Sequence, residues 1–178
     1  MPRSSAASAR SASPTAAQEA EQGPLTAADV QTYLAVRGKA LQKLEGKPVY
    51  RAMQAEGREW VNLFSPATVA RFDYVFTDSM TFTHDGRRMR LWMPKEVGEI
   101  KDPEKFMDVI VERTVGILNN EPIDIYVNPT FLPGAMARAY DRFWTAERMK
   151  KVIDAAVNND IAIEINNRYR IPSAKFIQ

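Results

Sequence analysis

Residues 161–173, with the sequence IAIEINNRYRIPS, contain both the fold signal and the candidate site of this chain. Ile163 and Ile165 alternate with Glu164 and Asn166, which is the period-two pattern of a β-strand. The apolar side chains are expected to pack under helices. The polar side chains are expected to line the lumen of a barrel or the crevice of an open sheet.

Three other segments have strand character, and helical segments separate them. The strand candidates are KPVYRAMQAEG, DYVFTDS and IDIYVNP, at residues 47–57, 73–79 and 123–129. Helix-capping residues begin the intervening segments at Ser65, Asp102 and Thr145. Strands that alternate with helices imply parallel strands joined by crossovers. The predicted fold class is therefore α/β, with about four parallel strands in either a partial barrel or an open sheet.

Two local patterns add detail to this prediction. Asp85-Gly86 is a hairpin turn signal between two short arms, so we expect a hairpin insertion after the second strand. In the third strand candidate, Ile123, Ile125 and Val127 share one face, and Tyr126 and Asn128 share the other. As in the fourth strand, we expect the apolar face under the helices.

Composition excludes several classes of protein. The 178 residues include 24 basic and 22 acidic residues, and a net charge of +2 gives no reason to expect nucleic acid or a membrane as a partner. The chain has no cysteine and one histidine, so disulfides, thiolate metal sites and sites with several imidazole ligands are excluded. Residues 1–24 are rich in Ala and Ser and are expected to be a disordered tail on a domain at residues 25–178. No targeting signal is recognised, so the default location is the cytoplasm.

Polar side chains close each of the four strand candidates. They are Glu56, Asp78, Asn128, Glu164 and Asn166. In parallel α/β folds the carboxyl ends of the strands form the ligand-binding edge, so we expect these groups to converge. The alternative is that polar residues stand there because the chain returns to water at the end of each strand.

Three arginines lie next to these strand ends. Arg168 and Arg170 follow the fourth strand, and Arg58 follows the first. A guanidinium group can hold a carboxylate or a phosphate through two hydrogen bonds, so recognition of a small anion is one interpretation. The other interpretation is structural: the arginines pair with Glu56 or Glu164, or cover the sheet.

The chain resembles the PHP (polymerase and histidinol phosphatase) superfamily of metal-dependent hydrolases. The resemblance rests on VYRAMQAEGREW, FDYVFTDSMTF and IYVNPTF, and most of all on AIEINNRYRIPSAKFI. It covers roughly residues 47–178. It implies a distorted, TIM-like β/α barrel that acts on phosphoesters or amides. It also implies that this chain is the middle of such a barrel, truncated at both ends. The tail, a partner chain or a second copy in a homo-oligomer would then cover its two open sheet edges.

The resemblance assigns roles to individual residues. Glu56 falls at the position of a metal ligand, and Asn128 takes the place of a usual histidine or cysteine. Asp78 and Glu164 are the candidate catalytic residues. The candidate substrate-binding residues are Asn128, Asn166, Arg168, Arg170 and Arg58. Because the histidine ligands of the family are missing, only weak binding of Mn²⁺, Mg²⁺ or Zn²⁺ is expected.

Two functional hypotheses follow. In the first, the chain is a hydrolase-like domain with weak or no activity on a small anionic substrate. In the second, it is a non-catalytic α/β module that binds a small anion, or an inactive remnant. A third, an open-sheet α/β enzyme unrelated to the barrel, is a weaker alternative, because no glycine-rich phosphate loop of the common types is present.

Overall fold

The computed structural model describes the chain in two units, residues 1–45 and residues 46–178. The described residues are 27–43, 46–47, 49–57, 60–84 and 86–178. The first unit contributes the helix α2 (Ala27–Gln42). The expected tail, Arg58 and Asp85 lie outside the described residues.

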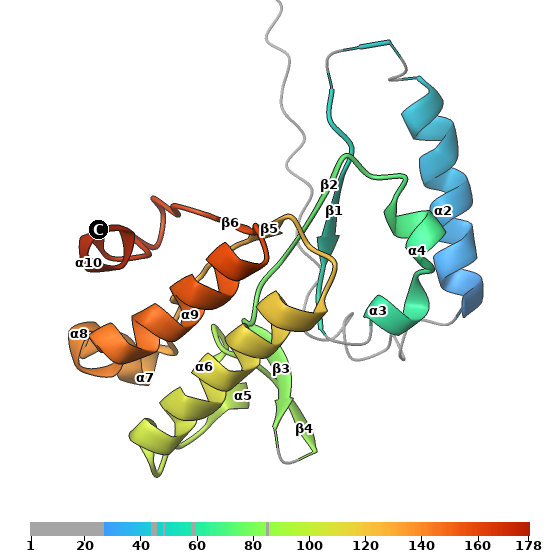
Figure 1. The fold of residues 1–178 in the computed structure, drawn as a ribbon. Helices are drawn as coiled ribbons and strands as arrows, with labels where there is room; N and C mark the ends of the chain where they lie inside the picture. Colours follow the sequence, from blue (N-terminus) through green and yellow to red (C-terminus); the bar gives the residue numbers. More distant parts are fainter. Residues whose placement is uncertain (1–26, 44–45, 48, 58–59, 85) are drawn as a thin grey trace, which may run out of the picture. The chain divides into compact units, whose positions relative to one another are not determined.

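Four parallel strands form the sheet of the second unit. They are β1 (Ala52–Ala55), β2 (Tyr74–Thr77), β5 (Ile125–Tyr126) and β6 (Ala162–Ile163), in the order β1-β2-β5-β6 (Figure 1). The prediction of an α/β fold with four parallel strands is confirmed. Among the described residues β1 and β6 do not pair with each other, so the sheet is open.

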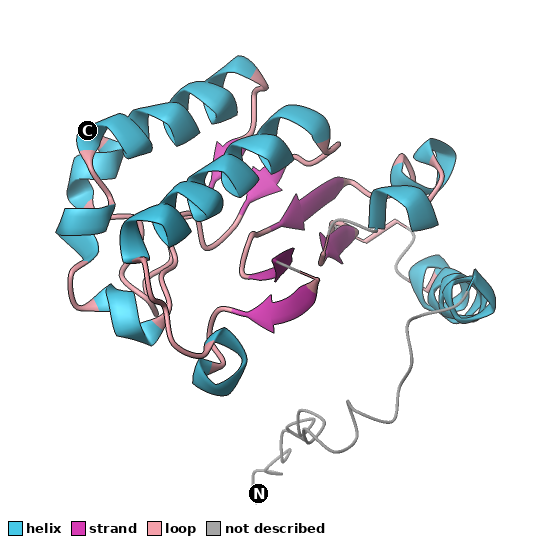
Figure 2. Cartoon of the chain, turned by 90° about the horizontal axis from the view of Figure 1, so that it is seen from below, coloured by secondary structure: helices cyan, strands magenta, loops and turns pink. Residues whose placement is uncertain are grey.

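Helical segments connect the strands and follow the last one. They are α3 (Trp60–Leu63), α4 (Pro66–Val69), α5 (Pro94–Val97), α6 (Pro103–Asn120), α7 (Gly134–Ala137), α8 (Tyr140–Phe143), α9 (Ala146–Asn158) and α10 (Ala174–Ile177). The long crossover helices α6 and α9 pack against each other and lie on one side of the strands (Figure 2). None of the described helices combines the length and the apolar character that a bilayer crossing requires.

The capping residues begin the helices as predicted. The side chain of Ser65 accepts a hydrogen bond from Thr68 N, and the side chain of Asp102 accepts one from Lys105 N. Thr145 caps α9 in the same way. These contacts satisfy backbone N–H groups that have no partner within the first turn of a helix.

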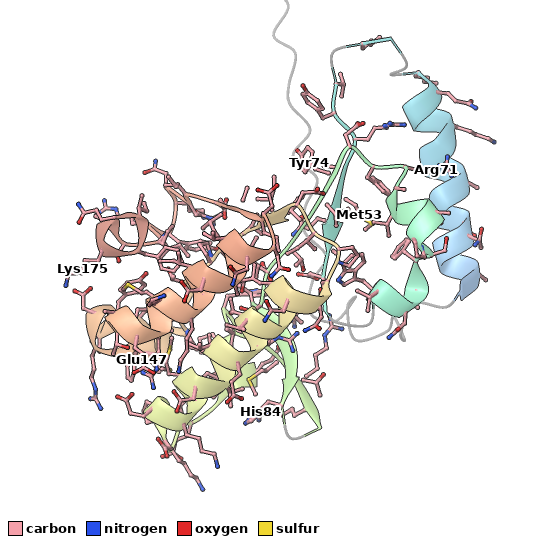
Figure 3. All side chains as sticks on the ribbon, in the orientation of Figure 1. Met53, Arg71, Tyr74, His84, Glu147 and Lys175 are labelled. Carbon is pink, nitrogen blue, oxygen red and sulfur yellow. The ribbon has the colours of Figure 1, made fainter. Side chains whose placement is uncertain are left out.

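The predicted hairpin is present as β3 (Thr81–His84) and β4 (Arg87–Arg90), directly after β2. The guanidinium of Arg90 forms an ion pair with Glu96 on α5, which fixes the hairpin to the next helix. His84, labelled in Figure 3, lies on the hairpin with its ring 6.3 Å from that of Phe106. The single histidine therefore packs against an aromatic side chain of α6.

In the third strand candidate, Ile123 is buried in the core as predicted, but Ile125 and Tyr126 show the opposite of the predicted faces. Tyr126 is fully buried, and its hydroxyl group meets Thr114 of α6, so its side chain points under the helices. Ile125 is only half-buried. The prediction was wrong because a tyrosine whose hydroxyl group has hydrogen-bond partners packs in a core as an apolar ring does. Ile165 also differs from its prediction: β6 ends at Ile163, and Ile165 is 70% exposed.

Candidate functional site

The register of the sheet places the predicted polar residues along one edge. Ala55 pairs with Thr77, Thr77 with Tyr126, and Tyr126 with Ile163, so these strands end in step. The residues that directly follow β1, β2 and β6 are Glu56, Asp78 and Glu164. We call this carboxyl edge, with Asn128 and Asn166, the rim.

Asn128 is the centre of the rim. Its backbone N–H donates to Glu164 Oε2 at 2.8 Å, and its Nδ2 donates to Asp78 Oδ2 at 3.1 Å. Its Oδ1 accepts a hydrogen bond from Asn166 Nδ2 at 2.9 Å. The backbone has a φ of 51°, a left-handed conformation in which asparagine is much commoner than most residues. One residue therefore joins the ends of β2, β5 and β6.

Asp78 is a half-buried carboxyl group of the rim. Its Oδ1 accepts a hydrogen bond from Met80 N at 2.9 Å. Burial raises the pKa of Asp78, and the nearby charge of Glu56 raises it further, against the hydrogen bonds from Met80 and Asn128 and the positive charge of Arg113. A carboxyl group with a raised pKa keeps its proton at higher pH than usual, which is the property of a general acid.

Asn166 connects the rim to the loop that follows β6. Its Oδ1 accepts a hydrogen bond from Tyr169 N at 3.1 Å, and its Nδ2 also approaches both oxygens of Glu164 at 3.4 Å. Asn166 and Ile171 exchange backbone hydrogen bonds of 2.7 and 3.2 Å. Residues 167–170 therefore form a closed four-residue loop, called here the arginine loop.

The arginine loop exposes both predicted guanidinium groups. Arg168 and Arg170 are exposed, and no carboxylate in the described part of the chain forms an ion pair with either. The proposed pairing with Glu164 is not formed, since that carboxylate binds Asn128 and Asn166 instead. Arg58 cannot be placed, because it lies outside the described residues.

A buried ring of hydroxyl groups lies behind the rim and was not predicted. Tyr126 OH donates to Ser79 Oγ at 2.7 Å, and both oxygens lie within 3.2 Å of Thr114 Oγ1. Burial raises the pKa of Tyr126 far above its ordinary value, so the phenol stays protonated. Thr114 in the middle of the apolar stripe of α6 was the only sequence signal, because a buried hydroxyl group needs a partner.

Arg113 is another residue near the rim that sequence reasoning missed. Its Nη2 donates to the backbone oxygen of Thr81 at 3.0 Å, and its charge acts on both Asp78 and Tyr126. It projects from α6, whereas the prediction considered only residues next to strands. No local pattern distinguishes it from a surface arginine.

The residues present do not form a metal centre of the kind that the family resemblance implies. Among the described residues, no three His, Cys, Asp or Glu side chains gather as ligands would. Both oxygens of Asp78 accept hydrogen bonds, as do both of Glu164. The chemistry available at the rim is therefore that of its own carboxyl, amide and guanidinium groups.

Two hollows in the described part of this unit lie away from the rim. One, of about 430 Å³, is at the amino ends of the strands beside Asp73, Glu121 and Asp124. The other, of about 860 Å³, runs between the outer faces of α6 and α9 and is lined by Glu104, Arg148 and Asp154 among others. The side chains around the second hollow already form ion pairs, such as that between Arg148 and Glu104 at 3.0 Å. Neither hollow contains the predicted site residues.

Comparison of the chain with protein-family models, with curated proteins and with solved structures gives no match. The assignment of a function therefore rests on the geometry of the rim and on the sequence motifs.

Proposed function

We propose that residues 47–178 form a hydrolase-like domain of the PHP type, whose rim binds a small anionic ester such as a phosphate monoester. The observation that carries the proposal is the hydrogen-bonded network of Asp78, Asn128, Glu164 and Asn166, which joins three adjacent strand ends. Strand ends that merely return to water have no reason to bind each other.

The order of the strands supports the barrel part of this proposal. The sheet follows chain order, β1-β2-β5-β6, and every pair is parallel. A doubly wound sheet reverses its order at a switch point, whereas a β/α barrel adds each strand next to the last. The four strands are therefore proposed to be part of a TIM-like barrel.

The arginine loop supports an anion as the ligand. Two exposed arginines without an ion pair to any described carboxylate belong to a loop whose backbone is hydrogen-bonded to Asn166 of the rim. Arginine binds phosphate oxygens through paired, charge-assisted hydrogen bonds, each worth about 1.5–3 kcal/mol. The carboxylates of the rim repel a free anion, so the guanidinium groups must provide the attraction.

Titration calorimetry with inorganic phosphate tests this proposal. We expect Arg168→Gln and Arg170→Gln each to weaken binding about tenfold, which corresponds to about 1.4 kcal/mol. Arg138→Gln is the matched control, because Arg138 is equally exposed but lies at the end of α7. Absence of phosphate binding by the wild-type protein, or an equal loss in the control, would refute the anion site.

Hydrolysis of the bound ester is a second candidate function, and the raised pKa of Asp78 is the observation that favours it. In this reaction water attacks the phosphorus atom while the bond from phosphorus to the ester oxygen breaks, and a protonated Asp78 donates its proton to the departing alcohol or phenol oxygen. We expect phosphate release from phenyl phosphate, measured with and without added Mn²⁺, to be lost in Asp78→Asn while phosphate binding remains. If the wild type releases no phosphate under either condition, the domain only binds its ligand.

A further inference from the structure

The arginine loop holds an aromatic side chain next to its cations. Tyr169 stands between the two arginines, and its backbone N–H is fixed to Asn166, the amide that also binds Asn128. The position of Tyr169 is therefore tied to the rim by two consecutive hydrogen bonds. A change in the network would move the loop with it.

Tyr169 forms a small aromatic surface with Phe131. The two ring centroids are 5.3 Å apart and the ring planes meet at 76°, an edge-to-face contact. Phe131 comes from the segment after β5 and packs against the core, whereas Tyr169 is 42% exposed. The core therefore holds the ring of Phe131 in place, and the exposed ring of Tyr169 packs against that ring.

A cation accompanies the exposed ring. The guanidinium carbon of Arg168 lies 5.6 Å from the centroid of Tyr169, within the range of a cation–π contact. Arg170 has a φ of 55°, a backbone conformation that costs a residue with a Cβ atom about 1–2 kcal/mol. The loop therefore has an arginine at a position where glycine would adopt the backbone conformation at a lower cost in free energy.

From this arrangement we infer that the anionic ligand of the rim carries a planar aromatic ring, as an aryl phosphate does. The inference rests on the proposed anion site and adds the chemistry of the group attached to the anion. The anionic group binds the guanidinium groups, and the ring packs against Tyr169 beside Arg168. An aromatic pair contributes about 0.5–1.5 kcal/mol beyond the burial of its area, and a saturated ring of the same size lacks this contribution.

Three probes separate the parts of this inference in one set of calorimetric titrations. They are inorganic phosphate, cyclohexyl phosphate and phenyl phosphate, where the two esters differ mainly in the planarity of the ring. We expect the wild-type protein to bind phenyl phosphate about fivefold to tenfold more tightly than cyclohexyl phosphate. In Tyr169→Leu the two esters should bind equally, with the affinity for inorganic phosphate unchanged.

Tyr50→Leu is the matched control, because Tyr50 is 80% exposed and lies before β1. It should keep the preference for phenyl phosphate, and circular dichroism should show that both variants are folded. Equal binding of the two esters by the wild type, or a preference that survives Tyr169→Leu, would overturn the inference while leaving the anion site intact. If inorganic phosphate does not bind either, the proposed function fails as well.

Discussion

Asn128 determines the geometry of the rim at the scale of a single residue, because it combines three hydrogen bonds with a left-handed backbone. Two substitutions separate these contributions. Asn128→Gly still allows the left-handed backbone conformation but removes two side-chain hydrogen bonds. We therefore expect it to lower the free energy of unfolding by about 1–2 kcal/mol. Asn128→Ala should cost about 1 kcal/mol more, since alanine disfavours a positive φ. Urea denaturation of both variants measures the difference. Equal losses would mean that the positive φ at this position does not disfavour alanine.

The raised pKa of Asp78 predicts a pH dependence of stability. The folded protein binds the Asp78 proton more tightly than the unfolded chain does, so ionisation of this group destabilises the fold. Its contribution is greatest below the ordinary value of 3.8 and is lost as the pH rises through the folded pKa. Asp78→Asn cannot ionise. We therefore expect the unfolding free energy of the variant, relative to wild type, to increase as the pH rises from about 4 into the mildly acidic range.

Urea denaturation at a series of pH values measures this difference. Asp141→Asn is the control for the loss of one negative charge, because Asp141 is exposed on α8. A constant difference between Asp78→Asn and wild type across the acidic range would show that burial does not perturb this carboxyl group.

At the scale of elements, the hydroxyl ring connects the end of β2 to β5 and α6. Tyr126→Phe removes the central hydroxyl group and leaves Ser79 and Thr114 with only each other. We expect a loss of about 1–2 kcal/mol in the free energy of unfolding, because two buried partners lose a hydrogen bond. Tyr50→Phe, at an exposed position, should change nothing. An unchanged urea midpoint for Tyr126→Phe would show that the hydrogen bonds among these hydroxyl groups do not stabilise the connection between the elements.

The elements themselves could be predicted because their signals are local. Ser65, Asp102 and Thr145 begin helices through contacts within three residues, and the alternation of strands and helices fixes the parallel direction. The convergence of Asp78 with Glu164 also followed, since parallel strands that end in step bring their ends together.

Features that depend on packing between elements could not be predicted. The faces of β5 were reversed because the pairing of Tyr126 with hydroxyl groups from β2 and α6 is not visible in its own segment. Arg113 reaches the neighbourhood of the rim from α6, and no spacing in the sequence encodes that proximity. The contact of Phe131 with Tyr169 joins two segments that are far apart in the sequence, so it could not be predicted either. The roles of the rim residues in binding stay predictions, because such a role is defined by contacts with a ligand.

At the scale of the whole molecule, β6 forms one edge of the sheet in the second unit. Ala162 N and Glu164 N bond to β5, so the backbone groups of Ile163, between them, point away from the sheet. No strand among the described residues pairs with this side of β6. Ile165, just beyond the strand, is 70% exposed. An exposed edge with an apolar side chain is a template for pairing with another strand.

This edge predicts that the protein associates with itself through β6. We expect the mass measured by light scattering after size-exclusion chromatography to rise with protein concentration, as more β6 edges pair. Ile165→Lys should shift that rise to at least about tenfold higher concentration, because a charge at an exposed edge opposes strand pairing. Val157→Lys is the control: Val157 is equally exposed, at 72%, but lies on α9 rather than on the edge. A wild-type protein that stays monomeric at every concentration, or an equal effect of both substitutions, would show that the β6 edge is not the contact.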